Sequence, residues 1–184
     1  AGLASLLRGI ADSAPPMLPP PLLIATDKNP LAVACTELLL HHCGAAAATV
    51  QTSMTEGLRI DGVVDIGVCN PPYVPTPPEE MLGCGIEVSW AGGDRGREMI
   101  DALLPRIAKL LSPQGRFYLV CLAENEPSEI LEAARGLRLR GSIARQEKRG
   151  IEELLILRFV WRSLEAGPPA GSYSTRVRGS HQKK

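Results

Sequence analysis

A chain of 184 residues, 45% of them apolar, fits one domain with a single buried core. Its 20 basic and 20 acidic side chains cancel, which excludes a whole-molecule positive field that would attract nucleic acid or anionic lipid. No run of about 18 apolar residues predicts a membrane span, and the start lacks the basic leader of a secretory signal. We therefore expect an intracellular protein, located in the cytoplasm and also in the nucleus.

The five cysteines are odd in number and widely spread, and no two of them form a Cys-x-x-Cys pair. This spacing predicts free thiols in a reducing compartment and no zinc or redox site. His41 and His42 are adjacent near the end of an expected helix, and neighbours on a helix do not face one another to hold a metal. The sequence therefore predicts no metal site.

The first third of the chain alternates helix and strand. Apolar residues at helical spacing predict a helix over 2–12, and the proline-rich stretch 13–21 predicts a loop. A short apolar run at 22–26 predicts a strand that ends in Asp27, after which Asn29 and Pro30 begin a helix that stops at Gly44. Residues 45–51 predict a weaker strand, because alanine is a poor strand former.

A β-branched run at 62–69 predicts a central parallel strand that leads directly into Asn70-Pro71-Pro72-Tyr73. A loop is expected from there to about Gly93. The pattern then predicts, in order, a helix from Asp94 to Leu111 with a kink at Pro105 and a stop at 112–115, a strand at 116–122, a helix at 128–135, and strands at 139–145 and 153–161.

This order of elements predicts an α/β fold with a mixed sheet that has an antiparallel edge. Residues 1–163 form the expected domain, and residues 164–184 are expected to be a disordered tail, because they contain almost no core side chains. Ligands of such sheets lie beyond the carboxyl ends of the strands, where Asp27 and Asn70 both fall. We therefore expect these two residues to face one pocket.

Asp27 stands between a strand and a helix, where a carboxylate can accept hydrogen bonds from both ribose hydroxyls of an adenosine cofactor. The alternative is an aspartate that caps the following helix, since Asp27 and Asn29 both precede the helix start.

Asn70-Pro71-Pro72-Tyr73 points to transfer of a group to a planar nitrogen. The two prolines fix φ and remove two backbone donors, so the loop is rigid and presents carbonyl oxygens. The Asn70 side chain and the Pro71 carbonyl can accept the two hydrogens of an NH2 group, and Tyr73 offers a ring for stacking. Methyl transfer from a sulfonium needs this alignment and no nucleophilic side chain. The alternative is an ordinary proline-rich turn, because Pro75, Pro77 and Pro78 follow.

Other residues of the same loop have both functional and structural interpretations. Glu79, Glu80 and Glu87 can act as general bases, although exposed acidic residues are usually only solvated. Trp90, which precedes Ala91-Gly92-Gly93, can be a lid over the substrate or a buried anchor of the loop.

Three motifs together resemble the HemK family of protein glutamine methyltransferases. They are residues 25–30 (Ala-Thr-Asp-Lys-Asn-Pro), residues 70–74 (Asn-Pro-Pro-Tyr-Val), and residues 85–98, which include Trp90-Ala91-Gly92-Gly93 and Gly96-Arg97-Glu98. The similarity runs from Gly2 to about Arg162. It fits best the eukaryotic and archaeal branch, which methylates the Gly-Gly-Gln glutamine of class-one peptide release factors.

The resemblance implies a Rossmann-like, class I methyltransferase of seven strands, with S-adenosylmethionine as methyl donor and a small zinc-binding activator subunit as partner in a heterodimer. It implies catalytic and substrate-binding roles for Asn70, Pro71, Pro72 and Tyr73, and substrate contacts for Val74 and Trp90. It also implies cofactor contacts for Asp27, Ser53, Met54 and Asn70. The branch is further linked to monomethylation of a histone H4 lysine, and its members were once described as adenine-specific DNA methyltransferases.

The sequence departs from the family pattern at two cofactor-side positions. The family opens with a strand and a Glu-x-Gly-x-Gly-Ser-Gly loop, and this chain begins at the last glycine of that loop, so we expect the first, central strand to be missing. The family also places an aspartate for the adenine amino group where this chain has Thr52-Ser53-Met54. Loss of a central strand predicts two unpaired edges in the sheet.

The function expected from the sequence is therefore methylation of a glutamine amide in a release factor. One alternative is methylation of an adenine amino group in nucleic acid, which the neutral net charge disfavours because duplex binding and base flipping need a basic face. The other alternative is an inactive fragment or splice form that only binds partners.

Overall fold

The computed structural model describes residues 22–45, 47–77 and 89–162. These residues fall into two compact units, residues Ala1–Ile60 and Asp61–Lys184, and each unit is described by itself. The helix expected over 2–12, Glu79, Glu80, Glu87 and the tail at 164–184 lie outside the described residues. The boundary at residue 163 therefore stays a prediction.

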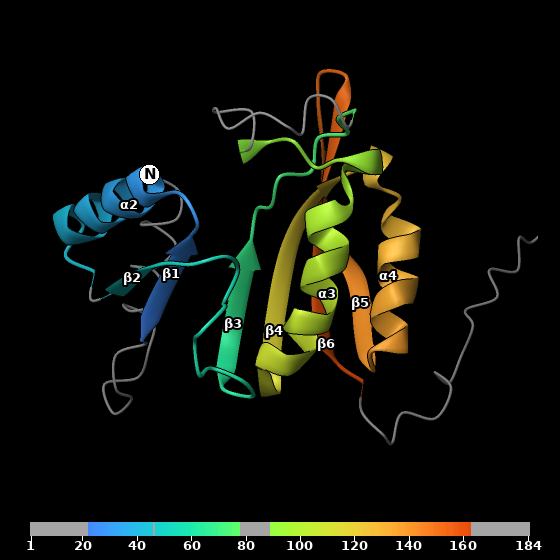
Figure 1. The fold of residues 1–184 in the computed structure, drawn as a ribbon. Helices are drawn as coiled ribbons and strands as arrows, with labels where there is room; N and C mark the ends of the chain where they lie inside the picture. The colour runs from blue at the N-terminus through green and yellow to red at the C-terminus, as the bar shows by residue number, and fades with distance from the viewer. Residues whose placement is uncertain (1–21, 46, 78–88, 163–184) are drawn as a thin grey trace, which may run out of the picture. The chain divides into compact units, whose positions relative to one another are not determined.

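The described residues of unit 1 form two parallel strands and one helix (Figure 1). Strand β1 (Leu23–Asp27) is followed by helix α2 (Pro30–His42) and strand β2 (Ala47–Gln51). The strands pair in register from Leu23 opposite Ala47 to Asp27 opposite Gln51, so both strands end at the same edge. The weak strand predicted at 45–51 is confirmed, because tertiary pairing outweighs the poor strand propensity of alanine.

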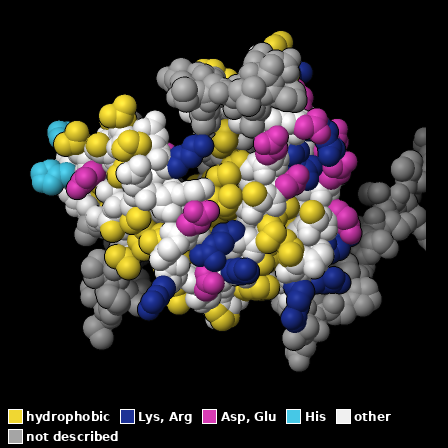
Figure 2. Space-filling model, viewed as in Figure 1, with side chains coloured by type: hydrophobic (Ala, Val, Ile, Leu, Met, Phe, Trp, Pro, Cys, Tyr) yellow, Lys and Arg dark blue, Asp and Glu magenta, His cyan; other side chains and the backbone are white. Residues whose placement is uncertain are grey.

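Unit 1 buries little of its apolar surface. Among its described residues only Leu40 is a buried large side chain, whereas Leu31 and Leu38 on α2 are 74% and 72% exposed. Helix α2 is apolar on nearly every side, and Figure 2 shows yellow apolar side chains on the surface over α2, beside the histidines in cyan. Burial of apolar side chains among the described residues of unit 1 therefore contributes little to its stability.

Unit 2 contains a four-stranded mixed sheet with the order β3-β4-β6-β5. Strand β3 (Val64–Cys69) is parallel to β4 (Leu111–Leu122), and β4 is antiparallel to β6 (Glu152–Trp161), which is antiparallel to β5 (Leu139–Arg149). The predicted mixed sheet with an antiparallel C-terminal edge is confirmed. Gly150, whose φ is +64°, makes the tight connection between β5 and β6.

Two helices cover one face of this sheet (Figure 1). They are α3 (Glu98–Leu110) and α4 (Pro127–Gly136), and short 3₁₀ turns precede them at η2 (Asp94–Gly96) and η3 (Ala123–Asn125). Helix α3 lies against β4, and helix α4 lies against β5. The fully buried side chains of this core include Ile100, Ile107, Leu119, Ile130, Leu157 and Phe159.

The prediction of one helix from Asp94 to Leu111 is wrong at both ends. Asp94–Gly96 is a 3₁₀ turn in which Arg95 has a φ of +52°, so the α-helix begins only at Glu98. It ends at Leu110, and β4 begins at Leu111 because this residue already pairs with Val64 of β3. A register shift between Val64 and Ile66 absorbs residues 112–115, which the sequence predicts as a stop. The helix runs through Pro105.

Strands β1 and β3 each pair with one other strand. Among the described residues, β1 pairs only with β2, and β3 pairs only with β4. Each of these two strands therefore lies at an edge of its own sheet.

Removal of a core side chain should destabilise unit 2. We expect Phe159→Ala to lower the free energy of unfolding by about 3–5 kcal/mol, because the ring is fully buried between the sheet and the helices. Chemical denaturation followed by circular dichroism measures this. The control is Ile151→Ala at a side chain that is 97% exposed, which should change stability by less than about 0.5 kcal/mol. Equal losses in both variants would contradict this description of the core.

Candidate active site

The reaction loop, Asn70-Pro71-Pro72-Tyr73, begins where β3 ends at the carboxyl edge of its sheet. Asn70 is exposed, Pro71 is buried, and Pro72 and Tyr73 are half-buried. The buried ring of Pro71 fixes the start of the loop, while the Asn70 amide beside it stays open to solvent. A rigid loop with one exposed amide is the arrangement that the sequence predicts for holding a planar NH2 group.

The loop is hydrogen-bonded to the segment that contains Trp90. The Val74 amide donates to the Trp90 carbonyl at 2.9 Å, and the Gly92 amide donates to the Val74 carbonyl at 2.8 Å. Two residues further on, the Thr76 amide donates to the Gly93 carbonyl at 3.0 Å, and the Gly93 amide donates to the Thr76 hydroxyl at 2.9 Å. The segment at 74–76 and the segment at 90–93 are therefore joined by backbone pairing although they are 16 residues or more apart in sequence. Val74 and Trp90 lie side by side.

Trp90 is 43% exposed, so its side chain is not the buried anchor that the sequence leaves as an alternative. The anchor is instead its backbone carbonyl, which holds Val74. The indole is thus available at the surface next to the reaction loop.

Glycine allows the loop and the second segment to approach closely. Gly96 has a φ of +66°, and a Cβ there would overlap the Tyr73 carbonyl. A Cβ on Gly92 would lie 2.9 Å from the Pro72 carbonyl oxygen. The backbones on both sides therefore touch without a side chain between them.

Asn125 is a functional candidate that the sequence analysis missed. Its side chain is fully buried, and its Nδ2 donates to the carbonyl oxygens of Tyr73 at 2.7 Å and of Arg95 at 2.8 Å. Its Oδ1 accepts from the Leu122 amide at 2.7 Å. The only signal in the sequence is an asparagine in the short turn between a strand and a proline-started helix.

Arg97 stabilises the turn η3 that contains Asn125. Its side chain is 7% exposed, and its guanidinium donates to the Asn125 carbonyl, to Asp101 at 2.6 Å and to Glu129 at 3.3 Å. A buried charge needs such partners, because burial without them is costly. The Gly96-Arg97-Glu98 motif thus joins α3 and α4 to the turn that holds the loop.

Three of the four residues predicted to contact the cofactor, Asp27, Ser53 and Met54, lie at one edge of unit 1, whereas the fourth, Asn70, belongs to unit 2. Asp27 and Gln51 end two paired strands, and the Thr52 amide donates to the Asp27 carbonyl at 3.0 Å. Ser53 and Met54 follow in a tight turn, in which Met54 has a φ of +49° and Glu56 bonds back to Ser53. The turn that contains Ser53 and Met54 therefore lies next to Asp27 at the end of β1.

The Asp27 carboxylate is exposed, and one oxygen accepts the Asn29 amide at 2.8 Å. Asn29 is the N-cap of α2, since its own Oδ1 accepts the Leu31 amide at 2.9 Å, so the capping role belongs to Asn29. A carboxylate has about four lone-pair sites and can accept ribose hydroxyls as well. A small hollow of about 40 Å³ lies beside Asp27. The exposed carboxylate, with lone pairs to spare, is chemically suited to the two hydroxyls of a ribose.

Asp27 and Asn70 belong to different units. The shared pocket expected from the sequence therefore stays a prediction.

The cysteines near the loop are not activated nucleophiles. Burial raises the pKa of the Cys69 thiol, next to Asn70, to about 11, and burial also raises the pKa of Cys121 to about 11. Both are therefore neutral at pH 7. Cys35, Cys43, Cys69 and Cys121 are free, and no group of side chains suited to a metal occurs in the ranges that the structure describes.

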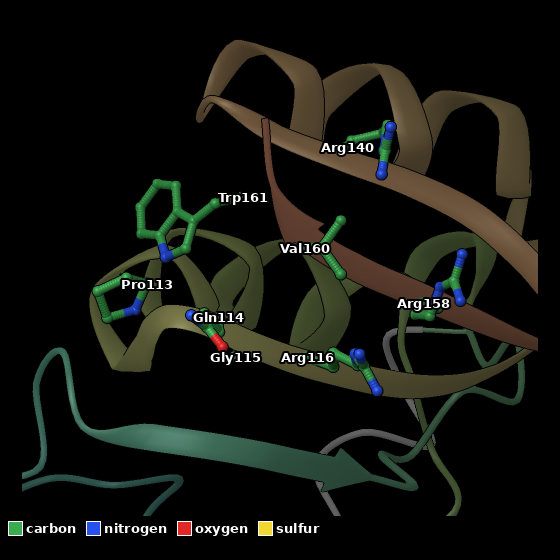
Figure 3. Close-up of a pocket in the computed structure, with 8 residues that line it drawn as sticks. All are labelled: Pro113, Gln114, Gly115, Arg116, Arg140, Arg158, Val160 and Trp161. Carbon is green, nitrogen blue, oxygen red and sulfur yellow. The ribbon is translucent and has the colours of Figure 1, made fainter. Parts of the chain in front are cut away.

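A hollow of about 390 Å³ lies at the other end of the unit 2 sheet (Figure 3). Its lining comes from the start of β4, the start of β5 and the end of β6, and it includes Arg116, Arg140 and Arg158. The reaction loop follows the carboxyl end of β3, which is parallel to β4, so this hollow is at the opposite edge. Ligands of such sheets bind at carboxyl ends, so the hollow is not the candidate active site.

The chain is similar in sequence to known methyltransferases, although no family model matches it. It is 46% identical over 144 residues to methyltransferase HEMK2 of Mus musculus, covering 77% of this chain and 67% of that protein. The chain belongs to the HEMK2 branch of the HemK methyltransferases. Its chemistry is methyl transfer, and its cofactor is S-adenosylmethionine.

Two further relatives extend this comparison. The chain is 40% identical over 116 residues to a Schizosaccharomyces pombe protein, the eRF1 methyltransferase catalytic subunit mtq2, covering 60% of this chain and 49% of that protein. The fold of this chain is similar to that of a chain in the E. cuniculi Mtq2-Trm112 complex, with a TM-score of 0.53 and 19% sequence identity. The match covers 86% of this chain and 94% of the other. The class I methyltransferase fold predicted from the sequence is confirmed. None of the described helices is long and apolar enough to span a membrane.

The role of Asp27 can be separated from helix capping. We expect Asp27→Ala to weaken S-adenosylmethionine binding roughly ten- to a hundredfold, since a charge-assisted contact contributes about 1.5–3 kcal/mol. Titration calorimetry measures the affinity. The matched control, Asn29→Ala, removes the cap of α2 and should cost about 1 kcal/mol of stability with little change in affinity. Unchanged affinity in Asp27→Ala would leave Asp27 with a structural role alone.

Thiol reactivity should follow burial. At pH 8 we expect exposed Cys35 to react with iodoacetamide much faster than Cys69 and Cys121, because a thiol whose pKa is about 11 carries almost no thiolate at that pH. Mass spectrometry of timed digests checks the order. Rapid labelling of Cys69 in the folded protein would show that the start of the reaction loop opens.

Proposed function

We propose that this protein methylates the side-chain amide nitrogen of a glutamine, the one in the Gly-Gly-Gln motif of a class-one peptide release factor. The observation that carries the proposal is the exposed Asn70 amide on a loop fixed by buried Pro71 and by the Trp90 segment. The Asn70 oxygen and the Pro71 carbonyl accept the two amide hydrogens of the glutamine. Tyr73 and the exposed Trp90 ring offer aromatic surfaces on which a flat amide group can stack.

S-adenosylmethionine supplies an electrophilic methyl group when it is bound. The cofactor would provide the methyl carbon with its sulfur as leaving group, and the glutamine nitrogen held by Asn70 and Pro71 would accept the methyl group and release one proton to water. The loop aligns the nitrogen and excludes wrong orientations, which is the larger part of catalysis for such a transfer. The thiols of Cys69 and Cys121 are neutral at pH 7, so neither competes as a nucleophile in this mechanism. Asp27, Ser53 and Met54 hold the ribose and adenine in this proposal.

Two comparisons support the substrate and the partner. The fission yeast relative acts on eRF1, and the E. cuniculi complex that methylates eRF1 contains Trm112 as a second protein. We therefore include a small zinc-binding activator subunit in the proposal. The leucines that α2 exposes are apolar surface of the kind that other polypeptides bury. Histone H4 lysine methylation and the cytoplasmic and nuclear locations stay predictions, because no described contact bears on them.

The sharpest test is Asn70→Ala in the full chain, assayed with and without the small partner subunit. We expect methyl transfer to a Gly-Gly-Gln peptide to fall on the order of a hundredfold, because misalignment by about 1 Å has that effect on rate. S-adenosylmethionine affinity should stay within a few fold. The control, Gln114→Ala, removes an exposed amide at the opposite edge of the sheet and should leave the rate unchanged.

Other outcomes separate the alternatives. Comparable transfer to adenine-containing DNA, with steep salt dependence, would replace the protein substrate by nucleic acid. Absence of cofactor binding in the wild-type chain, even with the partner, would favour the inactive form that only binds other proteins.

A further inference from the structure

We propose that Asn125 is the positioning residue of the methyl-transfer site, acting on Asn70 through the backbone of the reaction loop. This inference rests on the proposed function for its rate measurement, but the contacts that carry it are independent of any substrate. Asn125 lies 52 residues from Tyr73 in sequence and belongs to the turn η3 that follows β4.

One side chain joins three segments. The Asn125 side-chain amide donates one hydrogen to the Tyr73 carbonyl of the reaction loop. It donates the other to the Arg95 carbonyl in the turn η2. Its oxygen accepts the amide of Leu122, the last residue of β4. Two donors and one acceptor on a short arm are a property of asparagine, since aspartate has no donor when ionised and serine has only one.

The loop transmits the position of Tyr73 to Asn70. Only Pro71 and Pro72 separate these residues, and each proline ring fixes φ near −65°. The segment therefore has few soft dihedral angles, and a shift of the Tyr73 carbonyl moves the Asn70 amide with it. Strand β4 is the central support, because its end is held by Asn125 while its length pairs with both β3 and β6.

Because the Asn125 side chain is buried, loss of its hydrogen bond to Tyr73 is costly. Asn125 is 0% exposed, so water cannot replace a lost hydrogen bond to the Tyr73 carbonyl. The neighbouring ion pairs of Arg97 with Asp101 and Glu129 stabilise the same turn, but their side chains make no hydrogen bond to Tyr73 among the described contacts. They provide a comparison in which the turn is loosened and the loop contact is kept.

The test compares Asn125→Asp and Asn125→Ser with Glu129→Gln in the full chain. For the two Asn125 variants we expect kcat for the Gly-Gly-Gln peptide to fall on the order of a hundredfold, with S-adenosylmethionine affinity within about threefold of wild type. Hydrogen exchange should become faster at residues 73–76 and 90–93 and stay unchanged in β6. Glu129→Gln should keep kcat within about twofold even if its melting temperature falls by as much as in Asn125→Ser.

Measurements are made well below each melting temperature, so that the folded fraction does not limit the rate. A normal kcat in a folded Asn125→Ser protein would overturn the proposal, and so would unchanged exchange at 73–76. If the wild-type chain transfers no methyl group to the peptide, the proposed function fails by itself. Exchange at 73–76 in the variants then still decides whether Asn125 holds the loop.

Discussion

The hydrogen bond from the buried Asn125 amide to the Tyr73 carbonyl is the contact on which the candidate site depends. A loop with two consecutive prolines cannot join a β-ladder in the usual way, because two of its residues have no N–H to donate. Other hydrogen bonds fix the loop instead. Its backbone pairs with the segment that contains Trp90, and the Asn125 side chain binds the Tyr73 carbonyl. The glycines allow that approach, and the ion pairs of Arg97 keep the supporting turn in place.

The chain has its acceptor-side and cofactor-side groups on different sheets. Asn70 follows β3 in the four-stranded sheet, whereas Asp27 ends β1 in the two-stranded one. Both β1 and β3 are edge strands among the described residues, and exposed strand edges are prone to pairing with other chains. The unit with the acceptor loop has a well-buried core, whereas the described part of the unit with Asp27 buries one large apolar side chain, Leu40. Cofactor affinity should therefore respond to stabilising partners more strongly than the geometry of the loop does.

Much of the fold can be predicted from the sequence, because its strands and helices have strong periodic patterns. The β-branched run before Asn70 and the alternation in β6 are examples, and the position of Asp27 after a strand follows from the same reasoning. The helix end at Leu110 is not predictable, since strand pairing with Val64 decides it. Asn125 and Arg97 escape prediction for a related reason. Their roles come from contacts with residues 28 to 52 positions away or from a buried ion pair, and a single polar residue in a turn leaves no periodic signal.

The exposed indole of Trp90 has a practical consequence. The chain contains two tryptophans, and the other, Trp161, is half-buried and donates to the Leu111 carbonyl at the opposite edge of the sheet. One emitter therefore adjoins the reaction loop while the second reports on the body of the sheet. With Trp161 replaced by phenylalanine, the intrinsic fluorescence of the protein becomes an optical readout of the loop alone, usable without any label.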